Sequence, residues 1–425
     1  MARSVRTLLV PAFVSVTVLV GAFSPTATGA TWPTPINLSA SVADTHDAAV
    51  AVDSAGRAHV VWSEDGQVYH RYSIPGGGWS APARAASGHS PDLAAGPGGR
   101  VHMALAHRFA ESDEVYVLTW GEEGWGLPAN VSASGGVSSA PRIACSPGGE
   151  LAVVWVEEVA GAGLIHIARP VEGAVWSAGP VPNAQGARPA VAFVAGSPVV
   201  AWQDVYDLGF PLEVYASRWT GSGWTLPVAV SASPLTNSCF PALAGGPGGA
   251  WLGWEEVGEV YVSHLVDTSW AAPEKRSAEG PAHAPALAFD AAGGGHLVWT
   301  GGDAVQHRGF APLTGIWQAA EAVAWGQPGA MGVRVAAGGA SHVVWLAEAA
   351  PGNRDVYYSG PAGGQATPTA TRTATPSRTP TRTATPSRTP TRTATPTPAS
   401  SPGPTATPVA FDRGVFLAAV LVGER

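Results

Sequence analysis

Gly56-Arg57-Ala58-His59-Val60-Val61-Trp62 is the stretch that decides the fold of this chain. It combines a glycine turn, alternating apolar residues and a tryptophan, and the same pattern returns along the sequence. Further copies lie at 149–155, 196–202, 248–254, 293–299 and 339–345, and a degenerate copy at 99–105 ends in Leu105 instead of tryptophan. The copies recur every 43 to 52 residues. A period in the forties that is built of short strands predicts a β-propeller.

Two further markers fall once in each period. A Trp-x-x-Pro motif occurs at 79–82, 125–128, 224–227 and 270–273, and Trp176 and Trp317 hold the same place without the proline. A tyrosine-like position follows the repeated tryptophan, at Tyr69, Tyr116, Ile165, Tyr215, Tyr261, Gln306 and Tyr357. Short β-branched and aromatic runs between Gly, Pro and Ser clusters are strand signals, so each unit is predicted to form four strands.

The seventh unit lacks its outer strand, and a matching stretch stands at the other end of the repeats. Trp32-Pro33-Thr34-Pro35 and the following residues 36–39 parallel the outer strand at 224–231. We therefore predict an all-β fold over residues 31–360, a seven-bladed β-propeller of four-stranded blades that the N-terminal strand closes. Closure removes the exposed sheet edge. A six-bladed alternative would require the degenerate second unit to be something else.

The N-terminal residues 1–30 are predicted to be a secretory signal peptide. Arg3 and Arg6 supply a basic start, residues 8–23 are apolar, and residues 27–30 offer a small-residue cleavage site. The alternative is an uncleaved N-terminal anchor.

The C-terminal part departs from the repeats. Residues 361–410 contain TRTATPSRTP twice in succession and predict a disordered, extended Thr/Pro-rich stalk. Residues 411–425 form a short tail with an apolar run at 415–422, too short to cross a bilayer, so no membrane-spanning segment is expected in the mature chain. The tail is interpreted either as a short strand or as a docking signal beyond the stalk.

Charge is distributed unevenly along the chain. The total is −8, residues 1–30 contribute +2, residues 361–410 contribute +5 and the tail is balanced, which leaves −15 for the propeller. Nucleic-acid binding requires basic patches, so no nucleic-acid partner is expected.

The two cysteines fall in units that are not neighbours. Cys145 lies at the end of the inner strand of blade three, and Cys239 lies at the start of blade five. This separation exceeds what a disulfide allows, so both are predicted to be free, buried thiols.

Long loops between the second and third strands mark one candidate ligand site. The spacing from the repeated tryptophan (or Leu105) to the tyrosine-like position is 11, 10 and 13 residues in blades two, three and four, against 7 in blades one, five and six and 12 in blade seven. These adjacent loops offer aromatic stacking surface and carboxylates, as a sugar site needs. The candidate ligand-binding residues are Arg108, Phe109, Asp204, Tyr206, Asp207 and Phe210, and the same loops also carry Glu111, Asp113, Glu157 and Glu158. The alternative is that exposed loops are simply polar.

Histidine recurs at one position between blades, at His46, His89 and His283. Together with Asp47 these residues are candidate metal ligands near the axis. Duplicated units copy residues without copying function, however, so neither a metal nor another cofactor is expected. A second set, His59, His102, His296 and His342, lies within the second strands and is predicted to be structural.

The Gly-x-x-His-Val-Val-Trp and Trp-Ser-x-Pro patterns resemble the sialidase-like propeller superfamily of secreted bacterial proteins with BNR-like repeats. The comparable turns here are 53–56 and 290–293, and no unit has a true Asp-box. The resemblance implies three arginines that clamp a carboxylate, a Tyr-Glu nucleophile pair and an acidic Asp. Arg142, Arg188 and Arg334 stand where such arginines could lie, and no Tyr-Glu pair is identified.

Two functions follow as hypotheses. The first is a secreted or cell-surface binding module, a monomer, whose partner is a glycan or a cell-surface protein. The alternative is a sialidase-like exo-glycoside hydrolase, which would need paired carboxylates about 5–10 Å apart. Because the catalytic motifs are missing, we favour the binding module over an enzyme.

Overall fold

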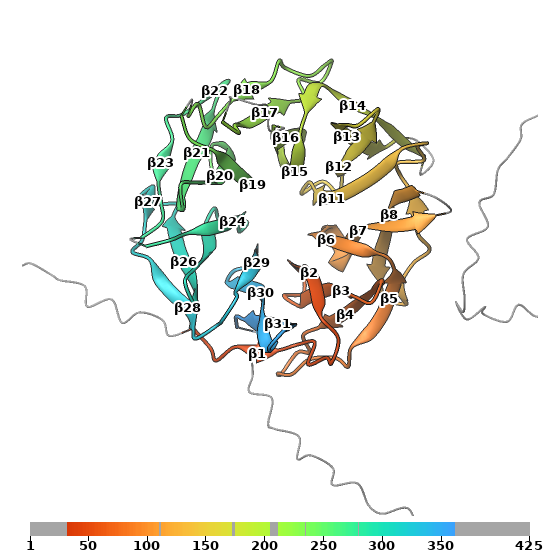
Figure 1. Ribbon diagram of the computed structural model, residues 1–425, viewed down its shortest axis with the longest axis vertical. Coiled ribbons are helices and arrows are strands. Elements are labelled where there is room, and N and C mark those ends of the chain that lie inside the picture. Colours follow the sequence, from red (N-terminus) through yellow and green to blue (C-terminus); the bar gives the residue numbers. More distant parts are fainter. Residues whose placement is uncertain are drawn as a thin grey trace, which may run out of the picture. The chain divides into compact units, whose positions relative to one another are not determined.

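The computed structural model describes residues 32–361 except 110–111, 172–174, 205–210, 234 and 279, with the side chain of Phe109 also left out. Seven antiparallel sheets surround a central opening in this part of the chain (Figure 1). The prediction of a seven-bladed propeller is confirmed, and the degenerate second unit forms a full blade. The segments 1–30 and 362–425, which include the signal peptide, the stalk and the tail, lie outside the described residues.

Each blade begins at the opening and runs outward. The innermost strands are β2 (Thr45–Val52), β6 (His89–Ala95), β11 (Val137–Cys145), β15 (Ala187–Val194), β19 (Ser238–Gly246), β24 (His283–Phe289) and β29 (Met331–Ala337). The second strands are β3 (Ala58–Glu64), β7 (Val101–Phe109), β12 (Leu151–Val159), β16 (Ser197–Gln203), β20 (Gly249–Glu256), β25 (Gly295–Gly301) and β30 (Ser341–Ala350). A single 3-10 turn, η1 (Pro97–Gly99), joins β6 to β7.

The outer half of each blade is less regular. The third strands are β4 (Gln67–Tyr72), β8 (Ser112–Gly121), β13 (Ala162–Pro170), β17 (Val214–Arg218), β21 (Glu259–Val266), β26 (Ala304–Ala311) and β31 (Asn353–Ser359). The outermost strands are β5 (Ala83–Ser87), the pair β9 (Gly124–Trp125) and β10 (Ala129–Asn130), β14 (Trp176–Gln185), β18 (Val228–Ala229), the pair β22 (Ser269–Trp270) and β23 (Glu274–Lys275), the pair β27 (Ile316–Trp317) and β28 (Glu321–Trp325), and β1 (Ile36–Asn37).

The proline of the Trp-x-x-Pro motif coincides with a break in the outermost strand in two blades. In blades two and five, Pro128 and Pro273 lie between two short pieces, because proline has no N–H to donate to the ladder. Blade three has Gly179 at the position of this proline, and its strand β14 runs for 10 residues with a register shift between Pro180 and Gln185. The break in blade six, after Trp317, has no proline to explain it.

The core of the described residues consists of eight clusters, one between each pair of neighbouring blades except blades four and five, which share two. The repeated tryptophan of one blade packs against the preceding blade: Trp155 contacts Ala104 and Val117 of blade two. Trp62 closes the circle, since it packs against Val344 of blade seven. All six repeated tryptophans, and Leu105 in blade two, are at most 2% exposed.

The tyrosine-like position pairs with the repeated tryptophan across the second and third strands. The rings of Trp62 and Tyr69 are stacked with centroids 6.0 Å apart. In blade three the residue opposite Trp155 is His166 rather than the predicted Ile165, so the loop before β13 is one residue longer than its sequence spacing suggested.

The N-terminal strand closes the ring as predicted. Ile36 and Asn37 of β1 pair with Tyr358 and Tyr357 of β31, which lies beside β1 in Figure 1. The Asp355 carboxylate then accepts hydrogen bonds from Asn37 Nδ2 and Ser39 Oγ at 2.6 and 2.8 Å. Closure therefore joins parts of the chain more than 300 residues apart.

Ring closure should contribute measurably to stability. Leu38, which follows β1, is fully buried between blades seven and one. We expect Leu38→Ala to lower the free energy of unfolding by about 2–5 kcal/mol, because it leaves a cavity in an interblade cluster. Val42→Ala, at a fully exposed position nearby, is the control in a denaturant titration. Equal stability of the two variants would contradict a role for closure.

Buried histidines should make the propeller sensitive to acid. Burial holds the pKa of His70 at about 3 and the pKa values of His102, His296 and His342 at about 4. An unfolded histidine binds a proton near pH 6.5, so the unfolded state takes up more protons below that pH and stability is lost as the pH falls from about 6.5 toward 4. His70→Phe should reduce the slope of unfolding free energy against pH by up to about 1.4 kcal/mol per pH unit. An unchanged slope in denaturant titrations between pH 7 and 4.5 would contradict this assignment.

Candidate functional site

A bulge near the start of every innermost strand shapes the central opening. The paired register shifts by one residue in all seven strands, between His46 and Ala49 in β2 for example. One residue of each bulge has a positive φ, namely Asp47, Ser90, Ala140, Arg188, Phe240, Ala284 and Gly332. Such bulges bend a strand and redirect its side chains. The bulges occur at the end of the blades where the loops between the second and third strands also lie. Redirected side chains therefore form a ring around this end of the channel.

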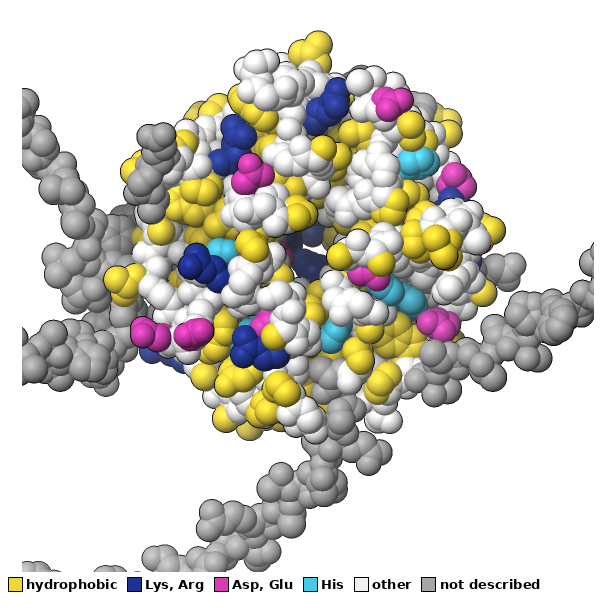
Figure 2. All heavy atoms as spheres, turned by 180° about the vertical axis from the view of Figure 1, so that it is seen from behind, with side chains coloured by type: hydrophobic (Ala, Val, Ile, Leu, Met, Phe, Trp, Pro, Cys, Tyr) yellow, Lys and Arg dark blue, Asp and Glu magenta, His cyan; other side chains and the backbone are white. Residues whose placement is uncertain are grey.

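Three arginines from three blades line one cavity at this ring. Arg142 lies in β11, Arg188 in β15 and Arg334 in β29, and the cavity has a volume of about 280 Å³. Basic side chains are visible in the depth of the central opening in Figure 2. The three arginines selected from the sequence are thus brought together, although their strands come from blades three, four and seven.

Each arginine is held by its own surroundings rather than by an acid. Arg142 Nη1 donates to the Pro141 carbonyl at 2.7 Å. The Arg188 guanidinium carbon lies 4.1 Å from the ring centroid of Phe240, in the next blade. Within the described ranges, neither residue, nor Arg334, forms a salt bridge. Their guanidinium donors therefore remain available to an oxyanion.

The same cavity contains one carboxylate among its described lining residues, that of Asp92 in β6. Asp92 Oδ2 accepts a hydrogen bond from the backbone N–H of Ile143 at 2.9 Å. Burial and the neighbouring charge of Arg142 lower the pKa of Arg334 to about 10, while Asp92 and Asp47 act in the opposite direction. Arg334 stays protonated at neutral pH, and the described lining of the cavity has three arginines against the one carboxylate of Asp92.

A ring of aliphatic side chains lies deeper in the channel. Each blade contributes one, and they are Val50, Leu93, Ile143, Val191, Leu243, Leu287 and Val335. A wider mouth of about 1230 Å³, lined by the turns between first and second strands, shares Val191, Leu243 and Leu287 with the arginine cavity. The aliphatic ring therefore lies between the arginine cavity and a wide mouth whose lining includes Asp53 and Asp290.

The two described candidates from the long loops, Arg108 and Asp204, do not line the arginine cavity. Arg108 is exposed near the end of β7, and Asp204 Oδ1 accepts a hydrogen bond from the Glu213 N–H at 2.9 Å. Burial, with the nearby charge of Glu213, raises the pKa of Asp204. Phe109 ends β7, but its side chain lies outside the described atoms, as do Tyr206, Asp207 and Phe210.

The carboxylate of Glu157, which sequence reasoning placed in a ligand loop, is buried and fully used by the fold. It accepts hydrogen bonds from Ser134 Oγ, Ser138 Oγ and Trp155 Nε1 at 2.5, 2.6 and 2.9 Å. Burial opposes its ionisation, yet these hydrogen bonds lower the pKa of Glu157. This residue ties the connection between blades two and three to the repeated tryptophan.

The three interblade histidines have separate partners. His46 lies 3.6 Å from Asp44, His89 lies 3.4 Å from Asp113, and His283 Nδ1 lies 2.9 Å from Glu255. In the part of the chain that the structure describes, no group of three or more His, Cys, Asp or Glu residues is arranged to hold a metal. The histidines within the second strands are packed inside the blades, as expected. His59 stacks on His70, and His342 Nδ1 lies 2.8 Å from the Tyr358 hydroxyl.

Both cysteines are free, as predicted. They are half-buried rather than buried, which corrects the prediction. The physical reason for Cys145 is that it ends an innermost strand and so lines the wide mouth of the channel. Burial raises the pKa of both thiols.

Sequence reasoning missed two residues of the arginine cavity, Asp92 and Phe240. A signal for both was present. Asp92 follows the bulge by two residues, as Arg142 and Arg334 do, and Phe240 holds the bulge position that Arg188 holds in the preceding blade. Alignment of the seven innermost strands by their bulges would have identified both.

No protein-family model and no curated protein matches the chain. Among solved structures, a catalytically inactive virginiamycin B lyase from Staphylococcus aureus is similar over 77% of this chain and 98% of its own, with 13% identity and a TM-score of 0.52. A polysaccharide lyase is similar over 74% and 89%, with 11% identity and a TM-score of 0.51. A Hadza microbial sialidase is similar over 71% and 73%, with 12% identity and a TM-score of 0.45. Identities this low show a shared propeller fold alone.

The described part of the chain has no helix long and apolar enough to cross a membrane.

The contacts of Glu157 predict a structural phenotype. Glu157→Ala leaves the hydroxyls of Ser134 and Ser138 and the indole N–H of Trp155 without their acceptor, so the free energy of unfolding should fall by about 2–4 kcal/mol. The neighbouring, exposed Glu158→Ala serves as the control. If denaturant titration finds both variants equally stable, Glu157 is not a structural residue.

Proposed function

We propose that this protein is a binding module whose central channel takes a ligand with an anionic group, such as an acidic glycan. The observation that carries the proposal is the convergence of Arg142, Arg188 and Arg334 on one cavity. Three guanidinium groups without carboxylate partners suit a carboxylate or sulfate, which they can hold by charge-assisted, bidentate hydrogen bonds. A volume of about 280 Å³ suits one sugar residue or a similarly small group.

Charge supports binding in this cavity despite the acidic character of the propeller. The −15 charge of residues 31–360 disfavours a polyanion at most of the surface. The channel is a local exception, because Asp92 is the one carboxylate among the described lining residues and three arginines line the same cavity. Anionic ligands should therefore bind there and at few other places, which favours a specific site over general adhesion.

The alternative is a sialidase-like exo-glycoside hydrolase, and the same arginine convergence is the observation in its favour. Glycoside hydrolysis ordinarily needs two carboxyl groups beside the scissile bond. The described residues that line the cavity include one carboxylate, Asp92, which already accepts the Ile143 N–H, and neither Tyr nor Glu. We therefore place binding before catalysis.

Export is part of the proposal. Residues 1–30 have the features of a secretory signal peptide, and the Thr/Pro-rich segment 361–410 has the composition of an extended stalk. A propeller on such a stalk would be secreted or displayed at a bacterial cell surface, where glycans and surface proteins are available as partners.

The channel arginines should determine binding of acidic sugars. We expect the full chain to bind sialylated or uronate-containing glycans on a glycan array. In calorimetry, Arg142→Gln and Arg188→Gln should each weaken the affinity about 10- to 100-fold, since each removes a charge-assisted contact. Arg84→Gln, at an exposed arginine of β5, is the matched control.

A fluorogenic sialoside assay separates the two functions. Binding without turnover supports the module. Turnover that Arg142→Gln and Arg188→Gln abolish would show that the protein is a hydrolase and not a binding module. Absence of acidic-glycan binding, or binding that both variants retain, would contradict the proposed role of the channel.

A further inference from the structure

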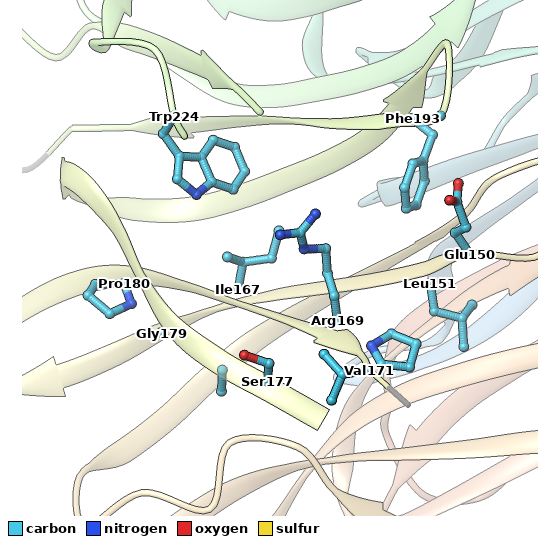
Figure 3. A pocket seen from close by; sticks show the side chains of 13 residues that line it. Glu150, Leu151, Ile167, Arg169, Val171, Ser177, Gly179, Pro180, Phe193 and Trp224 are labelled. Carbon is cyan, nitrogen blue, oxygen red and sulfur yellow. The ribbon is translucent and has the colours of Figure 1, made fainter. Parts of the chain in front are cut away.

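A second cavity lies away from the channel, between blades three and four. Its volume is about 500 Å³, larger than that of the arginine cavity. The walls come from the start of β12, the end of β13, strand β14 and, in blade four, Phe193 and Trp224 (Figure 3). Glu150 and Gly196, which line it, belong to turns between first and second strands. The cavity therefore opens at the opposite end of the blades from the bulges that carry the channel arginines.

The form of β14 creates one wall of this cavity. Strand β14 runs from Trp176 to Gln185 and contains Pro180 and Pro182. Its residues Trp176 to Pro180 pair with β13 from Pro170 to His166, and the register shifts between Pro180 and Gln185. Ser177, Gly179 and Pro180 of β14 then face the cavity (Figure 3).

Arg169 is the cation among the described residues that line this cavity. Its guanidinium carbon lies 4.6 Å from the ring centroid of Trp219, and in Figure 3 the guanidinium points between Trp224 and Phe193. Among the described residues Arg169 has neither a hydrogen bond nor a salt bridge to a side chain. Stacking on Trp219 uses the face of the guanidinium and leaves its edge, with its N–H donors, for an oxyanion.

The other lining groups complement a sugar. Trp224 and Phe193 supply aromatic surface, and Ile167 adds an apolar floor. Ser177 supplies an exposed hydroxyl, and the Glu150 carboxylate, whose Oε2 accepts from Ser146 Oγ at 3.0 Å, keeps acceptor capacity for ligand hydroxyls. Aromatic surface with a few convergent polar groups is the usual composition of a small-molecule site.

We propose that this cavity is a second binding site, specific for a saccharide that carries a carboxylate or sulfate group. Trp224 stacks against the apolar face of the sugar, Arg169 binds the oxyanion, and Glu150 and Ser177 accept or donate hydrogen bonds to hydroxyls. The site does not depend on the channel. With both sites present, one molecule holds two acidic sugar units at opposite ends of the blades and can bridge neighbouring glycan chains.

Calorimetry of the full chain with digalacturonate tests the proposal, with its uncharged methyl ester and a sulfated disaccharide as comparison ligands. Arg169→Gln should weaken the binding of digalacturonate to one class of sites about 10- to 100-fold. The same class of sites should lose its preference for digalacturonate over the methyl ester. Trp224→Leu should weaken the charged and the neutral ligand alike. Comparison of digalacturonate with the sulfated disaccharide identifies which oxyanion the site prefers.

Matched controls come from the repeat itself. Arg218 holds in blade four the place of Arg169, and Trp270 holds in blade five the place of Trp224, so Arg218→Gln and Trp270→Leu should leave binding unchanged. Circular dichroism of each variant checks that the propeller remains folded.

The outcomes separate this site from the channel. Two sites, of which Arg169→Gln removes one and Arg142→Gln the other, support both proposals. One site that Arg169→Gln removes supports the second site and contradicts the channel. Binding that Arg169→Gln and Trp224→Leu leave unchanged, or no binding of any of the three ligands, overturns the inference.

Discussion

The packing of one large side chain between each blade and the preceding one is the constraint on which this structure depends. Six tryptophans and Leu105 occupy this position, and all are at most 2% exposed. Single four-stranded blades bury too little apolar surface to be stable alone, so each relies on its neighbours. For Trp62, in blade one, the preceding blade in the ring is blade seven, and the two pack in one cluster. The clusters therefore form a closed cycle, and β1 pairs with β31 where the first and seventh blades meet.

Rigidity of the ring in turn positions the channel. The innermost strands have no freedom to shift separately, because interblade clusters hold them from both sides. Their bulges occur at the same register in every blade, so side chains at equivalent positions meet around one axis. Arg142 and Arg334 are such equivalents, and Arg188 reaches the same cavity from the bulge position itself.

Carboxylates in this propeller serve two different purposes. Glu157, Glu256 and Asp355 accept hydrogen bonds from serines of the connections between blades and hold those connections in place. Asp92 instead lies among arginines, where its negative charge partly offsets the positive charge of the cavity. An acidic residue in a loop therefore does not by itself mark a ligand site in this fold, since Glu157, Glu256 and Asp355 already accept hydrogen bonds from the fold. The unpaired cations, Arg142, Arg188, Arg334 and Arg169, are the more informative residues.

The fold could be predicted from the sequence alone, because the repeat period, the buried tryptophan and the strand markers are local patterns that recur along the chain. The sequence also determined ring closure, since Trp32 to Ser39 complete a pattern that the seventh unit leaves unfinished. Only the tertiary structure decided which residues meet. Arg142 and Arg334 are 192 positions apart, and nothing local shows that their side chains share a cavity with Asp92. The cavity around Arg169 likewise arises from contact between two blades and from the position of β14 beside β13. Repeats predict a scaffold because they are local, whereas a binding site depends on the few positions at which the repeats differ and on where the ring brings them together.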